Sequence, residues 1–155
     1  MSAGTAFFTK IHPDAILPTY GTKESVGLDL YLVEDVRIAP GELVLARTGL
    51  VVKPPLGTYF ELVLRSSVAI KNPGLVLANS IGIIDPDYSG PTDELKIALL
   101  DTRFVTEAFS GWKFYHFKKG DRIAQLILRE AQRVRVKERK ETSSTKRGGF
   151  GSTGD

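Results

Sequence analysis

The strongest constraint on the fold is the spacing of apolar residues, which recur at every second position rather than every third or fourth. Successive side chains of a β-strand point to opposite faces of a sheet, so this alternation is typical of strands with one buried face. Residues 67–71 alone suggest a short helical turn. The alternation predicts strands at residues 36–40, 42–52, 58–66, 74–79, 94–101, 112–117, 122–128 and 132–138.

Glycine and proline separate these segments and predict the turns between them, at residues 39–41, 54–57, 72–74, 89–91 and 119–121. Many short strands joined by such turns predict an all-β sandwich or barrel. After residue 136 the chain becomes charged, then rich in serine and threonine, then rich in glycine. We therefore expect a β domain over residues 1–136 and a linker with a C-terminal arm over residues 137–155.

Composition narrows the class of protein. A chain of 155 residues is long enough for one domain with its own core. The absence of cysteine excludes disulfides, zinc–thiolate sites and a cysteine nucleophile. There is neither a secretory leader pattern nor an apolar run near the ~20 residues that cross a bilayer. We expect a soluble protein of the cytoplasm, or of the nucleus or host-cell interior if the source is eukaryotic or viral.

The charge is unevenly distributed along the chain. The formal net charge is +3, but residues 113–147 hold 12 Lys and Arg against 4 Asp and Glu. A basic segment of this kind suggests an anionic partner. A solvated strand and linker would carry the same charges, and the sequence leaves both interpretations open.

Polar residues stand in or at the end of three apolar stretches. "LRSSVAIKNPG" ends a strand in Arg65, Ser66 and Ser67, which suit either phosphate binding or an ordinary helix cap. Asp29 in "VGLDLYL" is either a carboxylate near a metal or a surface residue. Gln125 in "KGDRIAQL" stands in an otherwise apolar strand, as a ligand contact or an edge-strand residue would.

The stretch "NSIGIIDPDYSG" is the most informative. A hairpin here would make a narrow slot of backbone groups around Ile83 and Ile84, with Asn79 able to donate and accept hydrogen bonds at its edge. Asp85 follows two apolar residues, so it could lie in a dry pocket and act as a base. Tyr88 offers a flat ring to a sugar or a base. The alternative is an ordinary β-turn, which would not account for Asn79 and Asp85 together.

Several catalytic signatures are missing. The chain has two histidines without ligand spacing, no phosphate-binding loop of the Walker type, no GxSxG and no HExxH. A hydrolase built on this chain would need a metal that its substrate largely carries. Mg²⁺ on a triphosphate fits, because Mg²⁺ keeps many waters and takes few protein ligands.

In order along the chain, five stretches resemble the motifs of the trimeric all-β deoxyuridine triphosphatases, the dUTPases. They are "VGLDLYL", "RSS", "NSIGIIDPDYSG", "KGDRIAQL" and "RGGFGSTG", and they span residues 26–154. The resemblance implies a distorted jelly-roll or sandwich-like barrel with a mobile glycine-rich arm. It also implies a homotrimer with shared active sites that hydrolyses dUTP to dUMP and pyrophosphate, which cleans the nucleotide pool and supplies the dTTP precursor.

The resemblance also implies residue roles. Asp85 would activate the attacking water, Tyr88 would pack under the deoxyribose, and Asp29 would reach Mg²⁺ through water. Phe150 would cover the uracil and Arg147 would lie near the terminal phosphate, although Arg147 is three positions before Phe150 where the family often has five. Substrate contacts are implied for Arg65, Ser66, Ser67, Asn79, Ile83, Ile84, Lys96, Gln125 and Gly151.

Two other functions compete. Deoxycytidine triphosphate deaminases share the fold and an "RSS"-type stretch, and Glu94 resembles their glutamate, although it lies in a longer linker, residues 90–95. A combined deaminase and diphosphatase falls under the same alternative. A β-sandwich that binds nucleic acid through the basic segment would need exposed aromatic residues. We expect dUTP as the partner, with no membrane and no specific nucleic acid.

Overall fold

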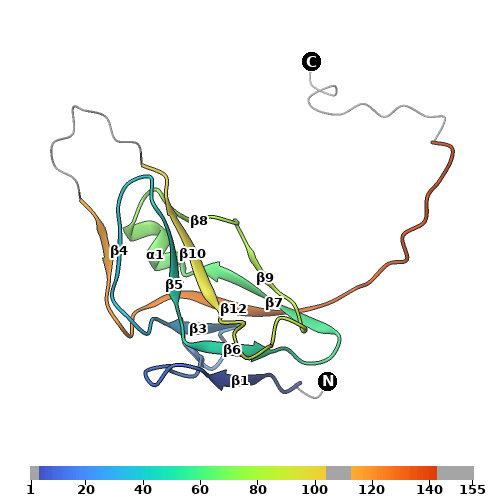
Figure 1. Cartoon of the computed structure of the whole chain (residues 1–155), viewed down its shortest axis with the longest axis horizontal. Helices are drawn as coiled ribbons and strands as arrows, with labels where there is room; N and C mark the ends of the chain where they lie inside the picture. Colours follow the sequence, from blue (N-terminus) through green and yellow to red (C-terminus); the bar gives the residue numbers. More distant parts are fainter. Residues whose placement is uncertain (1–3, 104–112, 143–155) are drawn as a thin grey trace.

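The computed structural model describes residues 4–103 and 113–142. These residues form short strands and one short helix (Figure 1). The elements are β1 Phe7–Lys10, β2 Thr19–Tyr20, β3 Gly27–Tyr31, β4 Val36–Ile38, β5 Leu43–Arg47, β6 Leu50–Lys53, β7 Thr58–Leu64, α1 Ser66–Lys71, β8 Leu75–Leu77, β9 Gly82–Ile84, β10 Lys96–Asp101, β11 Tyr115–Phe117 and β12 Arg122–Glu130.

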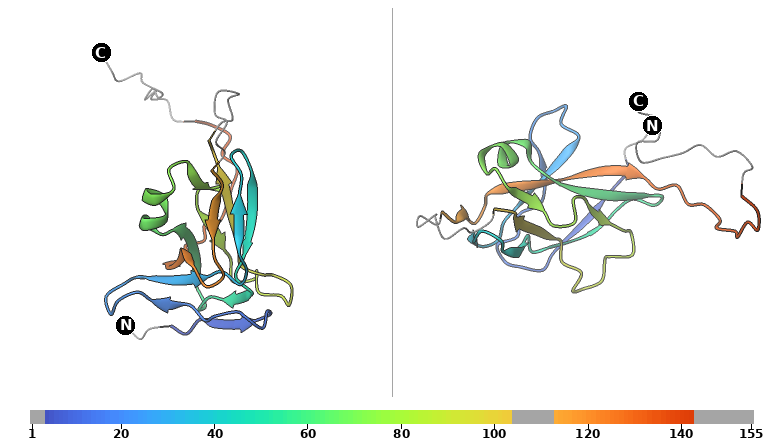
Figure 2. Two further views of the ribbon diagram at one scale, coloured as in Figure 1. Left: turned by 90° about the vertical axis from the view of Figure 1, so that its left-hand side faces the viewer. Right: turned by 90° about the horizontal axis from the view of Figure 1, so that it is seen from above.

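All strand pairs are antiparallel and form layered sheets. The largest sheet has the order β2-β3-β12-β7-β9, and a second has the order β5-β10-β8. Two further pairs, β1-β6 and β11-β4, complete the arrangement. Neighbours such as β7 and β12 are distant in sequence but lie side by side through the middle of the domain (Figures 1 and 2). The all-β fold predicted from the sequence is confirmed.

The core lies between the sheets and follows the predicted alternation. In β10, Ile97 and Leu99 are fully buried, whereas Lys96 is exposed and Ala98 and Leu100 are half-buried. Burial of each such aliphatic side chain contributes about 1.5–3 kcal/mol. The largest fully buried side chains are Phe60, Leu30, Leu32, Ile38, Leu50, Leu62, Leu95, Ile97, Leu99, Ile123, Leu126 and Val52.

One predicted strand, residues 42–52, is divided in two. β5 ends at Arg47 and β6 begins at Leu50, because Gly49 takes a φ of +66° that turns the chain between them. A Cβ on Gly49 would lie 2.5 Å from the Cβ of His12, so glycine is required for both conformation and space. The break lets β5 join the sheet of β10 while β6 pairs with β1.

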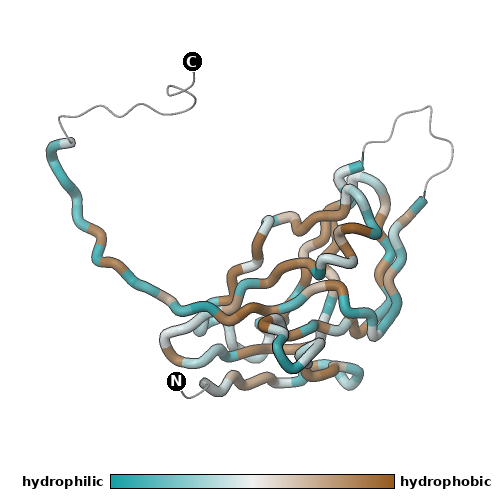
Figure 3. The backbone as a smooth tube through the Cα atoms, turned by 180° about the vertical axis from the view of Figure 1, so that it is seen from behind, coloured by the Kyte–Doolittle hydropathy of each residue, from teal (hydrophilic) through white to brown (hydrophobic). Residues whose placement is uncertain are grey.

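The prediction of a strand at residues 132–138 is wrong for the single chain. Residues 131–142 are exposed throughout and leave the domain as an extended arm (Figures 1 and 3). Val134 and Val136 are 84% and 89% exposed. Figure 3 shows that this arm is mainly hydrophilic, unlike the strands that cross the domain. A strand needs a hydrogen-bonding neighbour, and after the Ala131 N–H, which donates to the carbonyl of Gly57 at 2.9 Å, no strand among the described residues pairs with this segment.

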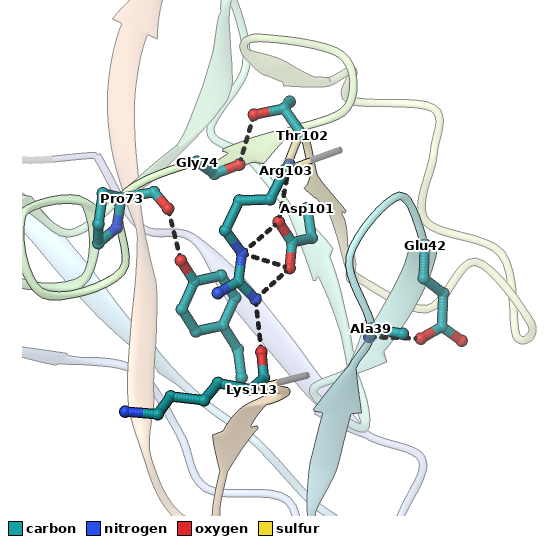
Figure 4. Close-up of polar contacts among 9 residues, drawn as sticks. Ala39, Glu42, Pro73, Gly74, Asp101, Thr102, Arg103 and Lys113 are labelled. Atoms are coloured by element: carbon teal, nitrogen blue, oxygen red, sulfur yellow. Dashed lines mark hydrogen bonds and ion pairs between the residues drawn. The ribbon is translucent and has the colours of Figure 1, made fainter. Parts of the chain in front are cut away.

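Arg103 pairs with the buried Asp101 and hydrogen-bonds to Lys113, and Arg103 and Lys113 are the described residues that flank residues 104–112 (Figure 4). Asp101 is fully buried and accepts hydrogen bonds from Arg103 Nε at 2.9 Å and Nη2 at 2.6 Å. The same Nη2 donates to the carbonyl of Lys113 at 2.8 Å, and the guanidinium lies 3.9 Å from the ring centroid of Tyr115. Burial alone would raise the pKa of Asp101, but the hydrogen bonds and charge of Arg103 outweigh it and lower that pKa.

Among residues 4–103 and 113–142, no helix is long and apolar enough to cross a membrane.

Candidate active site

Three of the sequence motifs meet at one cavity of about 390 Å³ beside the start of α1. Asp29 of β3 is 3% exposed and its carboxylate lies between two arginines. Arg65 Nε is 3.0 Å from Oδ1, and Arg122 Nη1 is 3.2 Å from Oδ2. The cavity is lined by Gly21, Thr22, Ser25, Gly27, Asp29, Arg65, Ser66, Ser67, Arg122 and Gln125. Asp29 is therefore neither an exposed surface residue nor isolated, and its two arginines leave the group with one net positive charge.

The backbone around Arg65 explains why these groups converge. The Arg65 N–H donates to the carbonyl of Ile123 at 3.0 Å, which continues the pairing of β7 with β12 to the first residue before the helix. Arg65 Nη1 also donates to the carbonyl of Arg122 at 3.1 Å. The arginine is thus held from two sides, which limits the rotamer freedom it would otherwise lose on binding an anion.

Gln125 is fixed by the register of the sheet. It lies opposite Asp29 on one side and Val63 on the other, so its amide and the Asp29 carboxylate share a face. Its Oε1 occupies the place of the missing Cβ of Gly27, only 2.1 Å from where that atom would be. Gly27 therefore leaves the space in which the Gln125 amide reaches the cavity.

Ser66 and Ser67 form the first turn of α1 and are exposed beside Arg65. The N-cap position is Arg65, and no side-chain hydrogen bond caps the helix. The cap interpretation of this stretch is therefore wrong. Two hydroxyls next to a guanidinium are suited to oxygens of an anionic ligand.

The hairpin predicted around Gly82 is not formed: Gly82–Ile84 make the single strand β9, and its hydrogen-bonded neighbour β7 is separated from it in sequence by α1 and β8. β9 pairs with β7, with Gly82 opposite Leu62 and Ile84 opposite Phe60. Ile83 is 54% exposed and Ile84 is 9% exposed, so the two side chains point to opposite faces. Asn79 is exposed at the entrance to this strand, where Ser80 adopts a φ of 62°. A Cβ on Gly82 would lie 3.0 Å from the Cβ of Leu62, which explains the glycine.

Asp85 and Tyr88 occupy the turn that follows β9. The Tyr88 N–H donates to the carbonyl of Asp85 at 3.1 Å, which closes the turn. Asp85 is exposed in the single chain, so the expected dry pocket is not formed by this chain alone. Tyr88 is 43% exposed, and its hydroxyl donates to the carbonyl of Glu94 at 3.1 Å.

The sheet register keeps Asp85 away from the cavity. β9 runs antiparallel to β7, so Asp85 lies one residue past the Phe60–Ile84 pair, while Arg65 lies five residues past it in the other direction. At about 3.3 Å per residue of strand, the two backbones are about 20 Å apart. A single chain therefore does not bring Asp85 to the arginines.

Comparison with known proteins gives the family. A family model named dUTPase matches residues 13–154. This chain belongs to the dUTPase family. Curated dUTPase-family relatives include the deoxyuridine 5'-triphosphate nucleotidohydrolase of Hydrogenobaculum sp., 41% identical over 148 residues with 94% of each chain covered. The protein of that name from Clostridioides difficile is 38% identical over 147 residues, again with 94% of each covered.

Solved dUTPase structures share the fold. The dUTPase of Staphylococcus bacteriophage 80alpha with dUPNHPP superposes with a TM-score of 0.79 at 25% identity, covering 98% of this chain and 99% of that one. A point mutant of the dUTPase from phage phi11 of S. aureus, described with a structural Mg(II) ion, has a TM-score of 0.76 at 23% identity and covers 90% and 99%. The jelly-roll-like architecture predicted from the motifs is thereby confirmed.

The remaining residues fall into three groups: a prediction away from the cavity, predictions outside the described residues, and cavity residues that were not predicted. Lys96 begins β10, is exposed, and does not line the cavity. Arg147, Phe150 and Gly151 lie outside the described residues. A third group, Arg122, Thr22 and Ser25, was not predicted from the sequence. Arg122 lies inside the "KGDRIAQL" stretch, three residues before Gln125, but its role depends on β12 pairing with β3, which a single sequence does not show.

The glutamate of the deaminase alternative has a different role. Glu94 is 5% exposed, and both carboxylate oxygens accept from Arg47 Nε, at 3.2 and 3.0 Å. One of them also accepts from the Gly49 N–H at 2.9 Å. A carboxylate engaged in this way is not free to shuttle protons to a base, so the geometry gives no support to deamination.

The aromatic residues beside the basic segment are likewise occupied. The guanidinium of Arg37 lies 3.4 Å from the ring centroid of Phe114, and that of Arg103 covers Tyr115. Phe117 is buried. Each of these rings therefore has a partner within the chain, which leaves less aromatic surface for stacking on a nucleic acid.

Proposed function

We propose that this chain hydrolyses dUTP to dUMP and pyrophosphate at sites that neighbouring copies complete for one another. The observation that carries the proposal is the cationic cavity at Asp29, Arg65 and Arg122, set about 20 Å along β7 from Asp85, the residue after β9. The family and its curated relatives support the reaction.

The cavity is suited to the triphosphate. Two arginines outweigh one carboxylate, and an anion therefore enters a site whose charge is already in place. Ser66, Ser67 and the amide of Gln125 add neutral donors around the same space. Charge-assisted hydrogen bonds to phosphate oxygens are roughly twice as strong as neutral ones. Phosphate binding at this cavity fixes the position of the chain's substrate before any bond breaks.

The segment around β9 is suited to the nucleoside. Asn79 and the backbone groups of Ile83 and Ile84 offer donors and acceptors for the edge of uracil. The ring of Tyr88, at the next turn, would pack under the deoxyribose and exclude a 2'-hydroxyl. A site that hydrogen-bonds its ligand rejects analogues whose groups leave those partners unpaired.

Asp85 would supply the base for the chemical step. Its carboxylate accepts a proton from a water molecule as the water oxygen bonds to the α-phosphorus. The bond from that phosphorus to the bridging oxygen of the β-phosphate breaks, and pyrophosphate leaves with the bridging oxygen. General base catalysis of this kind contributes about 10²–10⁴-fold.

The residues fit a Mg²⁺ ion that arrives with the substrate. Among residues 4–103 and 113–142, no three acidic or histidine side chains form a metal cluster. Asp29, held between two arginines, is the carboxylate that would reach such an ion through water. Bound to the triphosphate, the ion would neutralise phosphate oxygens and thereby favour the departure of pyrophosphate.

The C-terminal arm supports a shared site. Residues 131–142 leave the domain fully exposed, with Val134 and Val136 without cover in this chain. We propose that a homotrimer gives the arm a neighbour. In that assembly residues 137–155 would close over an adjacent site, with Phe150 on the uracil and Arg147 and the Gly151 backbone at the phosphates. Closing would exclude water from the reaction.

Product analysis tests the reaction. The purified chain is supplied with Mg²⁺ and, separately, dUTP, dTTP, dCTP and UTP, and pyrophosphate and ammonia are measured. We expect pyrophosphate from dUTP, with the other nucleotides at least ~100-fold slower. Comparable rates on dTTP, or ammonia from dCTP, would show that the proposed function is wrong.

Mixed oligomers test the shared site. Asp85→Asn and Arg65→Met are each expected to be inactive, and the two proteins are unfolded and refolded together. If Asp85 of one copy works with Arg65 of another, some sites in the hybrids carry both intact residues, and activity returns. A mixture shown by native mass spectrometry to contain hybrids, yet as inactive as its parents, would place both residues in the site of one copy and contradict the proposal.

A further inference from the structure

A chain of contacts links the ring of Tyr88 to an arginine on another strand. The Tyr88 hydroxyl donates to the carbonyl oxygen of Glu94 at 3.1 Å. Glu94 precedes β10, and its side chain is buried against Arg47 at the end of β5. The ring is 43% exposed, so this hydrogen bond holds one end of it while the face remains accessible.

Glu94 cannot shift without breaking several of its own contacts. Its carboxylate accepts from Arg47 Nε through both oxygens and from the N–H of Gly49. Its N–H donates to the carbonyl of Thr92 at 2.8 Å. The next residue, Leu95, is fully buried. The acceptor for the tyrosine hydroxyl is therefore fixed on both the side-chain and the main-chain side.

The loop between Tyr88 and Glu94 is also closed on itself. Asp93 accepts from the Gly90 N–H at 2.7 Å, and its own N–H donates to the Gly90 carbonyl at 3.1 Å. This short bridge and the Tyr88–Glu94 hydrogen bond tie the two ends of the loop together. The Arg47–Glu94 pair is the side-chain contact that joins this loop to β5.

We propose that Arg47 and Glu94 are positioning residues for sugar discrimination, acting through the hydroxyl of Tyr88. This inference rests on the proposed function, because it assumes that the Tyr88 ring packs under the deoxyribose. The two residues fix the Tyr88 ring in the position at which it leaves no room for the 2'-hydroxyl of a ribose. Neither residue lines the phosphate cavity, so we expect their loss to change which sugar is accepted more than it changes the chemical step.

The first experiment replaces Arg47 by methionine, which keeps an unbranched stem and removes the cation. The measured quantity is the ratio of kcat/KM for dUTP to kcat/KM for UTP. We expect this ratio to fall by about two- to tenfold, the change that corresponds to one lost hydrogen bond of ordinary strength. An unchanged ratio in a folded Arg47→Met protein would overturn the proposal.

A matched control lies at the other end of β10, the strand that Glu94 precedes. Arg103 pairs with Asp101 at the end of β10, and the arginine and carboxylate side chains are 32% and 0% exposed, against 37% and 6% for Arg47 and Glu94. Arg103→Met therefore breaks a pair of the same kind and burial, but one with no link to Tyr88. We expect it to lower thermal stability and leave the sugar ratio unchanged. An equal loss of discrimination in both variants would mean that general loosening of the domain is the cause.

A double-mutant cycle separates positioning from stability. Tyr88→Phe removes only the hydroxyl, and we expect it to lower the ratio as Arg47→Met does. If both act through the same hydrogen bond, the double variant is no worse than the single ones. Additive losses would show that Arg47 does not act through the hydroxyl.

Two outcomes keep this test distinct from the proposed function. If Arg47→Met does not fold, Tyr88→Phe carries the test alone, and an unchanged ratio in that variant overturns the proposal. If the wild-type chain does not hydrolyse dUTP, the proposed function itself fails. If the wild-type chain hydrolyses dUTP but the dUTP-to-UTP ratio is unchanged in Arg47→Met, Tyr88→Phe and the double variant, only the positioning role is refuted.

Discussion

Replacing Gly27 by alanine should reduce activity without weakening the fold. The new Cβ would lie 2.1 Å from Oε1 and 2.8 Å from Cδ of Gln125, distances that real structures do not tolerate. The obstructing atoms are the far end of a flexible side chain, so the Gln125 amide moves and the backbone stays. Gly27 lies within β3 and does not take a positive φ, so alanine is not strained there.

The expected magnitudes follow from these contacts. Alanine in place of a strand glycine gains roughly 0.5–1 kcal/mol, because glycine loses more freedom on folding. Forcing Gln125 out of its rotamer costs about 0.5–1.5 kcal/mol, so the free energy of unfolding should change little. A lost hydrogen bond to a charged phosphate is worth about 1.5–3 kcal/mol, which corresponds to a fall in kcat/KM of about 10- to 150-fold.

The assay compares four proteins by pyrophosphate release and urea unfolding: wild type, Gly27→Ala, Gln125→Ala and the double variant. Once Gln125 is alanine, only its Cβ remains near position 27, at 3.3 Å, and the collision is gone. Gly27→Ala should therefore add little in that background. If it lowers kcat/KM just as much there, the effect does not pass through Gln125 and the reasoning is refuted.

Three further predictions follow from the site and the core. Asp85→Asn should lower kcat by ~10²–10⁴ while calorimetry still detects dUTP binding; more than about a tenth of wild-type kcat would mean that Asp85 is not the base. Truncation after Lys146 should leave the circular dichroism spectrum unchanged but abolish most pyrophosphate release. Phe150→Ala should lose about 1–3 kcal/mol of stacking. Full activity of the truncated chain would show that the C-terminal residues take no part in the active site. The lowered pKa of Asp101 adds stability that is present above its ordinary value of 3.8 and is lost as the pH falls through the folded value. The destabilisation by Arg103→Met, measured in urea, should therefore shrink between about pH 7 and about pH 3, whereas a constant difference would contradict this account.

Most of the strands could be predicted because their periodicity is local. Ile97 and Leu99 alternate with less buried neighbours, and that pattern is visible in the sequence. The division of residues 42–52 was not predicted, because it depends on the approach of His12 to Gly49 from a distant part of the chain. Residues 132–138 were predicted as a strand from an alternation that includes Val134 and Val136, but pattern alone does not supply a pairing partner.

The candidate site was predicted as a set of residues but not as an arrangement. The motif resemblance named Asp29, Arg65 and Gln125, which the structure brings together at one cavity. It did not indicate Arg122, whose contact with Asp29 arises from the β3–β12 pairing. Nor did it show that Asp85 lies far along β7, since strand register is set by tertiary packing of both faces.

The contacts of Arg103 with Asp101 and Lys113 make the stability of the domain insensitive to the length of the chain between residues 103 and 113. Because Arg103 follows β10 and hydrogen-bonds to the carbonyl of Lys113, two residues before β11, the chain between them begins and ends at a fixed pair of points. The entropic contribution to the free energy of closing such a segment rises by only about 0.6 kcal/mol for each doubling of its length. Lengthening the chain between residues 103 and 113 therefore adds little to this closure cost as long as Arg103 and Asp101 hold the two ends in place.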